Sequence, residues 1–246
     1  MRRPPQVKRG VKGKMAGRFG VYSVAFGGVD EFAFATGAQV GPDVASSIAI
    51  WCRVPASASI QGLWGEYAAA GSGARYLQIR DTGAIQYVVV SNDAGTAVST
   101  TTATVGLDNG LWHLFVVTER SDRLHNIYID GALATGPTNY AGNAVTVDGF
   151  TIARRPSGVG VFDRYLIGDV AHLAIWTREL TAADVTRLWN QGTDWDWRTL
   201  ASGRPRDDFW LGENDTFPTL TNRGSAPTAN ITLTNLEAAD IQRVSP

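Results

Sequence analysis

Short runs of apolar and β-branched residues, separated by turn-forming residues, make up most of the chain between Tyr22 and Trp176. Glycine, asparagine, aspartate and proline interrupt these runs at short and fairly regular intervals, which is typical of antiparallel strands. The pair Asp130-Gly131 lies between two such runs and is a strong signal for a hairpin turn. The strands that we predict cover residues 22–26, 31–35, 47–54, 75–80, 85–91, 112–119, 125–129, 150–153 and 171–176.

An all-β fold follows from this pattern, because many short strands without alternating helices indicate an antiparallel sandwich or barrel. Residues 87–90 do not alternate strictly between polar and apolar, so we expect their strand to be covered on both faces. One short amphipathic helix should follow the last predicted strand. Thr181 is placed as its N-cap, Val185 and Leu188 recur at helical spacing, and Gly192 ends the run.

The charge is divided unevenly along the 246 residues. The whole chain has 22 basic and 23 acidic residues and a formal charge of −1. Residues 1–18 contain seven bases and no acid, which leaves 15 bases against 23 acids, a charge of −8, in residues 19–246. The seven bases of this arm, our candidate partner-binding residues, are Arg2, Arg3, Lys8, Arg9, Lys12, Lys14 and Arg18.

Three regions follow from composition and pattern: a basic N-terminal arm (1–19), a sandwich (20–192), and a Trp-rich connection with an extended tail (193–246) that packs on the sandwich or on a neighbour. The arm has too few apolar residues to fold alone, so we expect it to become ordered on a partner. The acidic body makes nucleic acid an improbable partner. No apolar run is long enough for a membrane span or a signal peptide, and the single Cys52 cannot form an internal disulfide.

Several segments resemble the laminin-G-like, concanavalin A-like lectin/glucanase superfamily, especially the domains found in bacteriophage virion proteins. The resemblance covers about residues 20–192 and implies a jelly-roll sandwich. Two segments of the tail, 209–219 and 233–241, are similar to tails of such domains in phage-encoded proteins. The segments that carry the main resemblance are YSVAFGGVDEFAF (22–34), SIAIWCRV (47–54), WHLFVV (112–117), IYIDG (127–131), GDVAHLAIW (168–176) and RELTAADV (178–185).

We predict no catalytic residues and no enzyme. Glycosidases on this fold need two carboxylates, which one branch supplies from a single strand as E-x-D-x-x-E. None of the six glutamates has that setting; the Glu213–Asp215 spacing fits, but it falls in a predicted turn. Cys52 is interpreted as an inert, half-buried thiol. The three histidines, interpreted as packed or rim residues and not as metal ligands or acid/base groups, are His113, His125 and His172.

No cofactor or metal is expected. Three Asx pairs, Asn92-Asp93, Asp108-Asn109 and Asn214-Asp215, could contribute to a Ca²⁺ site, but turn chemistry explains them better. Candidate glycan-binding residues are Trp195 and Trp197, and also Trp64, because exposed indoles can stack on sugars. The alternative, which we prefer, is that these tryptophans lie in the core or clamp the C-terminal segment onto the sandwich.

The function expected from the sequence is that of a phage virion structural protein, a decoration or cement protein on the capsid surface. The arm would bind the major capsid protein or other virion proteins, and the chain would be a homo-oligomer, with a trimer as one suitable form. The alternative is a lectin module of a head or tail fibre that binds bacterial surface glycans. Within the virion, a location on the capsid surface is favoured over one on the tail.

Overall fold

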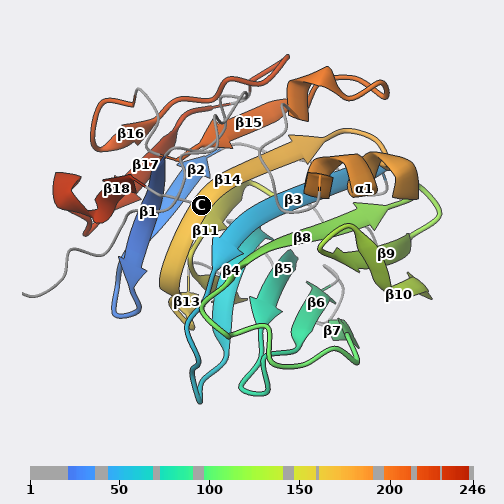
Figure 1. The fold of residues 1–246 in the computed structure, drawn as a ribbon, viewed down its shortest axis with the longest axis horizontal. Coiled ribbons are helices and arrows are strands. Elements are labelled where there is room, and N and C mark those ends of the chain that lie inside the picture. Colours follow the sequence, from blue (N-terminus) through green and yellow to red (C-terminus); the bar gives the residue numbers. More distant parts are fainter. Residues whose placement is uncertain are drawn as a thin grey trace, which may run out of the picture.

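The computed structural model describes residues 22–36, 44–68, 73–90, 97–140, 147–158, 161–190, 197–211, 215–227 and 229–243. Two antiparallel sheets face each other and enclose the core (Figure 1). The strands of the first sheet are β1 (Tyr22–Gly27), β3 (Ser46–Arg53), β8 (Trp112–Glu119), β9 (Leu124–Ile129), β10 (Ala132–Asn139), β14 (Ile167–Trp176), β15 (Asp207–Trp210) and β18 (Ile241–Arg243). Their order is β10-β9-β8-β3-β14-β1-β18, and β15 pairs with the second half of β14.

The second sheet also contains eight strands. They are β2 (Phe32–Thr36), β4 (Gln61–Tyr67), β5 (Ala74–Ile79), β6 (Ile85–Val90), β7 (Ala97–Thr101), β11 (Gly149–Ile152), β16 (Thr219–Leu220) and β17 (Ile231–Thr234). Their order is β16-β17-β2-β11-β4-β5-β6-β7. A separate hairpin is formed by β12 (Arg155–Gly158) and β13 (Val161–Asp163). The architecture is therefore the expected all-β sandwich.

Alternation along the strands builds the main core between the sheets. On β3, Ile48, Ile50 and Cys52 point inward, because successive side chains of a strand point to opposite faces. A second apolar cluster lies on the outer side of the first sheet. There α1 (Ala182–Trp189) packs Val185 and Leu188 over β3 and β8 (Figure 1).

All nine strands predicted from the sequence are present, with ends that move by a few residues. The hairpin at Asp130-Gly131 is confirmed: both residues have positive φ, 51° and 82°, as a type I′ turn requires. The helix is also confirmed. Thr181 caps it by accepting a hydrogen bond from the Asp184 amide, and left-handed Asn190 ends it. Gly192, the predicted terminator, lies outside the described residues.

Two strands that the pattern did not predict, β4 and β10, have weak alternation. β4 contains Gly62 and Gly65, and β10 contains Gly136 and Pro137. They become strands because neighbours on one or both sides supply hydrogen-bond partners. The tail strands join both sheets: β15 and β18 extend the first sheet, and β16 and β17 extend the second. The basic arm, residues 1–19, falls outside the described residues.

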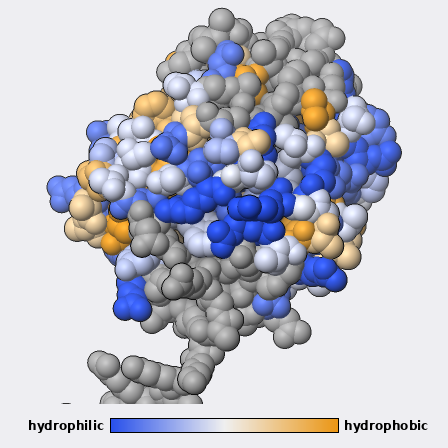
Figure 2. All heavy atoms as spheres, turned by 90° about the horizontal axis from the view of Figure 1, so that it is seen from above, coloured by the Kyte–Doolittle hydropathy of each residue, from blue (hydrophilic) through white to orange (hydrophobic). Residues whose placement is uncertain are grey.

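The surface seen from above is largely hydrophilic over its described residues, and its hydrophobic residues are scattered in small groups (Figure 2). No helix in the described ranges is long and apolar enough to cross a membrane.

Candidate binding site

Two phenylalanines of β2 point away from the core. Phe32 and Phe34 are half-buried, whereas the intervening Ala33 and Ala35 are buried between the sheets. The Phe32 and Phe34 ring centroids lie 5.9 Å apart. Large aromatic rings on the outer face, with small residues on the inner face, reverse the usual arrangement of a strand with one solvent-facing side. The position of two large rings on the outer face of β2 therefore needs an explanation other than packing of the main core.

Arg154 holds this aromatic surface together. Its guanidinium carbon lies 3.4 Å from the centre of the Phe32 ring and 3.5 Å from the centre of the Phe162 ring. Such stacking suits the planar, delocalised guanidinium group. The Arg154 Nε donates a 2.8 Å hydrogen bond to Thr151 Oγ1 on β11. Burial lowers the pKa of Arg154 to about 10, so the group stays cationic at neutral pH.

The β12–β13 hairpin, which supplies Phe162, lies directly on β4. Gly62 and Gly65 make this possible, because a Cβ at either position would come within 2.5 Å of the hairpin segment. At Gly62 the clash would be 2.4 Å from the Arg154 carbonyl carbon. Arg155 then closes the hairpin with two hydrogen bonds to Asp163, of 2.8 and 2.6 Å. The glycines and this ion pair thus fix the hairpin over the second sheet.

Two tyrosines complete the surface. Tyr67 of β4 contacts Phe162 edge to face, with ring centroids 4.9 Å apart. Tyr165 lies 6.4 Å from Phe32 between ring centroids. Exposed Thr232 on β17 is the register partner of Phe34 and adds a hydroxyl beside the rings. We call the five half-buried rings the aromatic platform: Phe32, Phe34, Tyr67, Phe162 and Tyr165.

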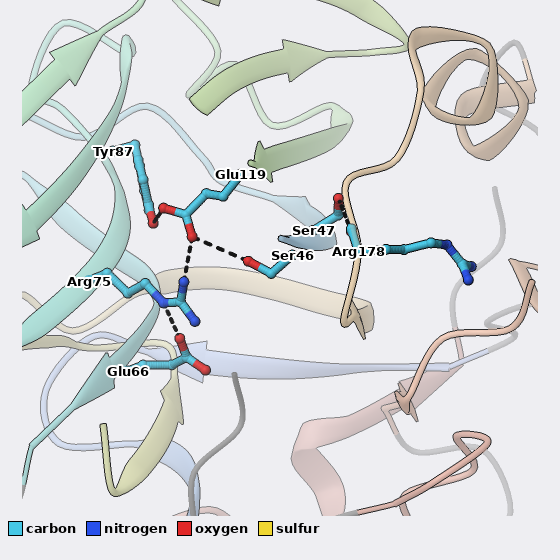
Figure 3. Close-up of polar contacts among 7 residues, drawn as sticks. All are labelled: Ser46, Ser47, Glu66, Arg75, Tyr87, Glu119 and Arg178. Atoms are coloured by element: carbon cyan, nitrogen blue, oxygen red, sulfur yellow. Dashed lines mark hydrogen bonds and ion pairs between the residues drawn. The ribbon is translucent and has the colours of Figure 1, made fainter. Parts of the chain in front are cut away.

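The fold also brings two glutamates together, but inside the sandwich. Arg75 of β5 pairs with Glu66 of β4 and, across the gap between the sheets, with Glu119 of β8 (Figure 3). Tyr87 and Ser46 donate hydrogen bonds of 2.6 and 3.2 Å to Glu119. Burial raises the pKa of Glu66. Glu66 is 0% and Glu119 4% exposed, so neither carboxylate can reach a substrate in solution, and the cluster connects the sheets.

A family model, described as the concanavalin A-like lectin/glucanases superfamily, matches residues 26–186. The chain belongs to this superfamily. The comparison with curated proteins found no match. Both the fold and the family expected from the sequence are thereby confirmed.

Solved structures agree with the superfamily fold. A protein from Bacteroides ovatus, described as a candidate carbohydrate-binding protein, has a TM-score of 0.65 at 13% identity; the match covers 93% of this chain and 61% of that one. The native heptameric SAP-like pentraxin from Limulus polyphemus has a TM-score of 0.57 at 10% identity, covering 86% and 94%. The CBM40 module of the Ruminococcus gnavus IT-sialidase, bound to alpha2,3 sialyllactose, has a TM-score of 0.51 at 13% identity, covering 68% and 97%. At these identities the likeness shows the fold alone.

The superfamily sandwich places the tryptophans predicted to bind glycans in buried positions. Trp64 is 0% exposed in the main core, and Trp197 is 3% exposed. Trp197 stacks on His172 of β14, with ring centroids 3.7 Å apart, and so fastens η2 (Trp197–Thr199) to the first sheet. A buried indole presents no face to a sugar, so the glycan assignment is wrong for these two residues and the core or clamp alternative holds. Trp195 lies outside the described residues.

Among the described residues of the three Asx pairs, Asn109 makes a local turn contact, whereas Asp108 and Asp215 bond to residues more distant in sequence. Asp108 accepts a 3.1 Å hydrogen bond from the Ser57 amide, and Asn109 caps the Leu111 amide at 2.9 Å. Asp215 pairs with Arg223 at 2.8 Å. Asn92, Asp93 and Asn214 fall outside the described residues. Within the described part of the chain, no group of three or more His, Cys, Asp or Glu side chains could hold a metal ion.

The three histidines are packed inside the fold, in line with the expectation that they are packed or rim residues. His113 contacts Asp130 at 2.7 Å, His125 contacts Thr100 at 2.8 Å, and His172 contacts Asp208 at 2.6 Å. Cys52 is fully buried instead of half-buried, and burial raises its thiol pKa.

The sequence pattern does not reveal the aromatic platform, because its members come from three separate segments. The Phe32-Ala33-Phe34 triplet was the available signal. A strand that alternates large aromatics with alanines must place one of the two sets outward, and only the small set fits a tightly packed interior here.

Proposed function

We propose that the chain is a non-catalytic glycan-binding module and that the aromatic platform is its sugar-binding surface. The observation that carries this proposal is the fixed row of half-buried rings on the outer face of the second sheet, stacked against Arg154. Rings that merely filled space would be covered, whereas these keep part of their surface in solvent.

The chemistry of the platform suits a pyranose. The C–H face of a sugar packs against an aromatic face, and polar groups beside the rings fix its hydroxyls. Thr232 stands beside Phe34 and can donate or accept a hydrogen bond. Rigid rings also lose little conformational entropy on binding. The carbohydrate-binding descriptions of the Bacteroides ovatus and Ruminococcus gnavus proteins support the same assignment.

A glycan array that displays bacterial surface polysaccharides tests this function. The wild-type chain should bind a subset of glycans saturably, and Phe34→Ala should abolish that binding without lowering the melting temperature greatly. Leu133→Ala is the matched control, because Leu133 is 55% exposed on β10, the edge strand of the other sheet. Binding that survives in Phe34→Ala, or a wild-type chain that binds no glycan, would refute the proposal.

A second candidate function rests on the division of charge. Seven bases in residues 1–18 and a charge of −8 in the rest of the chain suit an arm that docks on an acidic surface. We propose that this arm anchors the chain to a phage capsid, through the major capsid protein or another virion protein, as a decoration or cement protein. The sandwich would then project outward, so the two proposed functions are compatible.

Deletion of residues 1–18 separates this role from glycan binding. The deleted chain should keep its sandwich and its glycan binding but should no longer occupy virions. Raising the salt concentration should weaken attachment of the full chain, because exposed charges are screened over about 8–10 Å at physiological ionic strength. Normal occupancy after the deletion would exclude the anchoring role. Sedimentation of the full chain tests the proposed oligomer, a trimer being one form.

A further inference from the structure

A second open surface lies on the first sheet, and its wall residue Ile167 follows Tyr165 of the aromatic platform by two positions. It is a hollow of about 420 Å³, within the range of small-molecule sites, and it lies over β1, β3, β14 and β18. Two charged side chains and one amide line it, together with apolar walls. The lining residues that matter for its chemistry are Arg53, Pro55, Ile167, Gly168, Asp169 and Gln242.

Strand alternation directs the charged pair into the hollow. Cys52 and Val54 point into the core, so Arg53 between them points outward, and Asp169 points outward beside the inward Val170. Arg53 donates to a single oxygen of Asp169, Oδ2, from Nε at 2.9 Å and from Nη2 at 2.8 Å. Among the described residues this leaves Asp169 Oδ1 without a donor and Arg53 Nη1 without an acceptor.

The lining of the hollow combines a tightly packed backbone with apolar walls. Gly168 has a φ of 149°, and a Cβ there would lie 2.4 Å from the Arg53 carbonyl oxygen. Glycine is therefore required at position 168, where β14 lies close against the β3 backbone. Exposed Pro55 and Ile167, the latter 43% exposed, form apolar walls. Trp112 lies beside the pair, with its ring centre 5.4 Å from the Arg53 guanidinium carbon.

The charge of the hollow selects the ligand class. Arg53 and Asp169 cancel, so neither an anion nor a cation gains from the site as a whole. A neutral ligand with adjacent groups that both donate and accept hydrogen bonds fits better. Vicinal hydroxyls of a sugar ring meet this need: one donates to Asp169 Oδ1, the other accepts from Arg53 Nη1, and the exposed Gln242 amide can do either.

We propose that this hollow is a separate binding site for a neutral sugar unit, held through two adjacent hydroxyls by Asp169 and Arg53. The site lies on the other sheet from the aromatic platform and uses different side chains. Its failure would therefore leave the proposed glycan-binding function of the platform intact, and the reverse also holds.

The experiment maps binding on the wild-type chain by NMR, with methyl glycosides of glucose, galactose and mannose as neutral probes at millimolar concentrations. Methyl N-acetylneuraminide and glucosamine serve as the anionic and cationic probes. At least one neutral glycoside should shift the backbone amide signals of Gly168 and Gln242. Asp169→Ala should weaken that binding at least about tenfold, whereas Phe34→Ala should leave it unchanged.

Gln242→Ala provides a second variant if Asp169→Ala fails to fold, because Gln242 is exposed near the chain end and its loss should weaken binding severalfold. Three results would overturn the proposal. The first is no amide shift at Gly168 or Gln242 with any neutral glycoside, and the second is shifts with the charged sugars alone. The third is undiminished binding in folded Asp169→Ala or Gln242→Ala.

Discussion

Tyr87 of one sheet donates a 2.6 Å hydrogen bond to Glu119 of the other. This bond, together with the Arg75 ion pairs, places a polar connection within a mainly apolar core. Buried polar groups of this kind destabilise a fold when a partner is removed, because the remaining group keeps its desolvation cost.

Removing the Tyr87 hydroxyl tests the connection. Tyr87→Phe keeps the ring against Trp64 but takes a donor from Glu119, so the free energy of unfolding should fall by about 1–3 kcal/mol. Chemical denaturation measures this change. Tyr22→Phe, at a half-buried position at the start of β1, is the control and should alter stability by less than about 0.5 kcal/mol. Equal stability of the two variants would mean that the buried bond contributes nothing.

Glu66 should give the stability a dependence on pH. Its pKa is raised in the folded protein, mainly by burial, so the stability that it contributes is complete below its ordinary value of 4.5 and is lost as pH rises through the folded pKa. Glu66→Gln removes this titration and keeps an acceptor for Arg75. The variant should therefore gain stability relative to wild type as pH rises above 4.5. Parallel pH profiles from denaturation curves would contradict this expectation.

His125 should make the stability depend on pH in the opposite direction. Burial lowers its pKa below the ordinary 6.5, so the folded state resists protonation and loses stability as pH falls from 6.5 toward the folded pKa. The ring lies edge to face on Tyr87, with centroids 5.1 Å apart. His125→Gln should flatten the loss of melting temperature between pH 7 and pH 5, measured by calorimetry. A variant as acid-sensitive as wild type would assign that loss to other groups.

Arg154 should control the hairpin of the aromatic platform. Arg154→Lys keeps the charge but loses the planar group that stacks between Phe32 and Phe162, at a cost of about 0.5–2 kcal/mol for each ring contact. Amide hydrogen exchange should speed up in residues 155–158 and 161–163 while protection in β3 and β8 stays unchanged. Arg187→Lys, on the exposed face of α1, is the matched control. Unchanged exchange in the hairpin would show that the stack does not hold it.

Local pattern was enough to predict much of the fold. The alternating strands, the hairpin at Asp130 and the cap at Thr181 depend on residues close together in sequence. The pattern does not predict β4, because Gly62 and Gly65 break its alternation. These positions must be glycine because the β12–β13 hairpin, about ninety residues later in the chain, packs directly on them. The same reason explains the error at the candidate site. The residue type of Trp64 suggests an exposed indole that could stack on a sugar, but its burial depends on the packing of both sheets.

The sequence by itself determined the strand periodicity, the helix with its cap, the family and the division of charge between arm and body, because each of these is a local or additive property of the chain. Only the tertiary structure decided which aromatic rings face solvent. It also decided that Glu66, Arg75 and Glu119 meet inside the sandwich and that Arg53 and Asp169 share a hollow. Exposure and charge pairing depend on strands that are distant in sequence, and only the packing of the sheets brings them together.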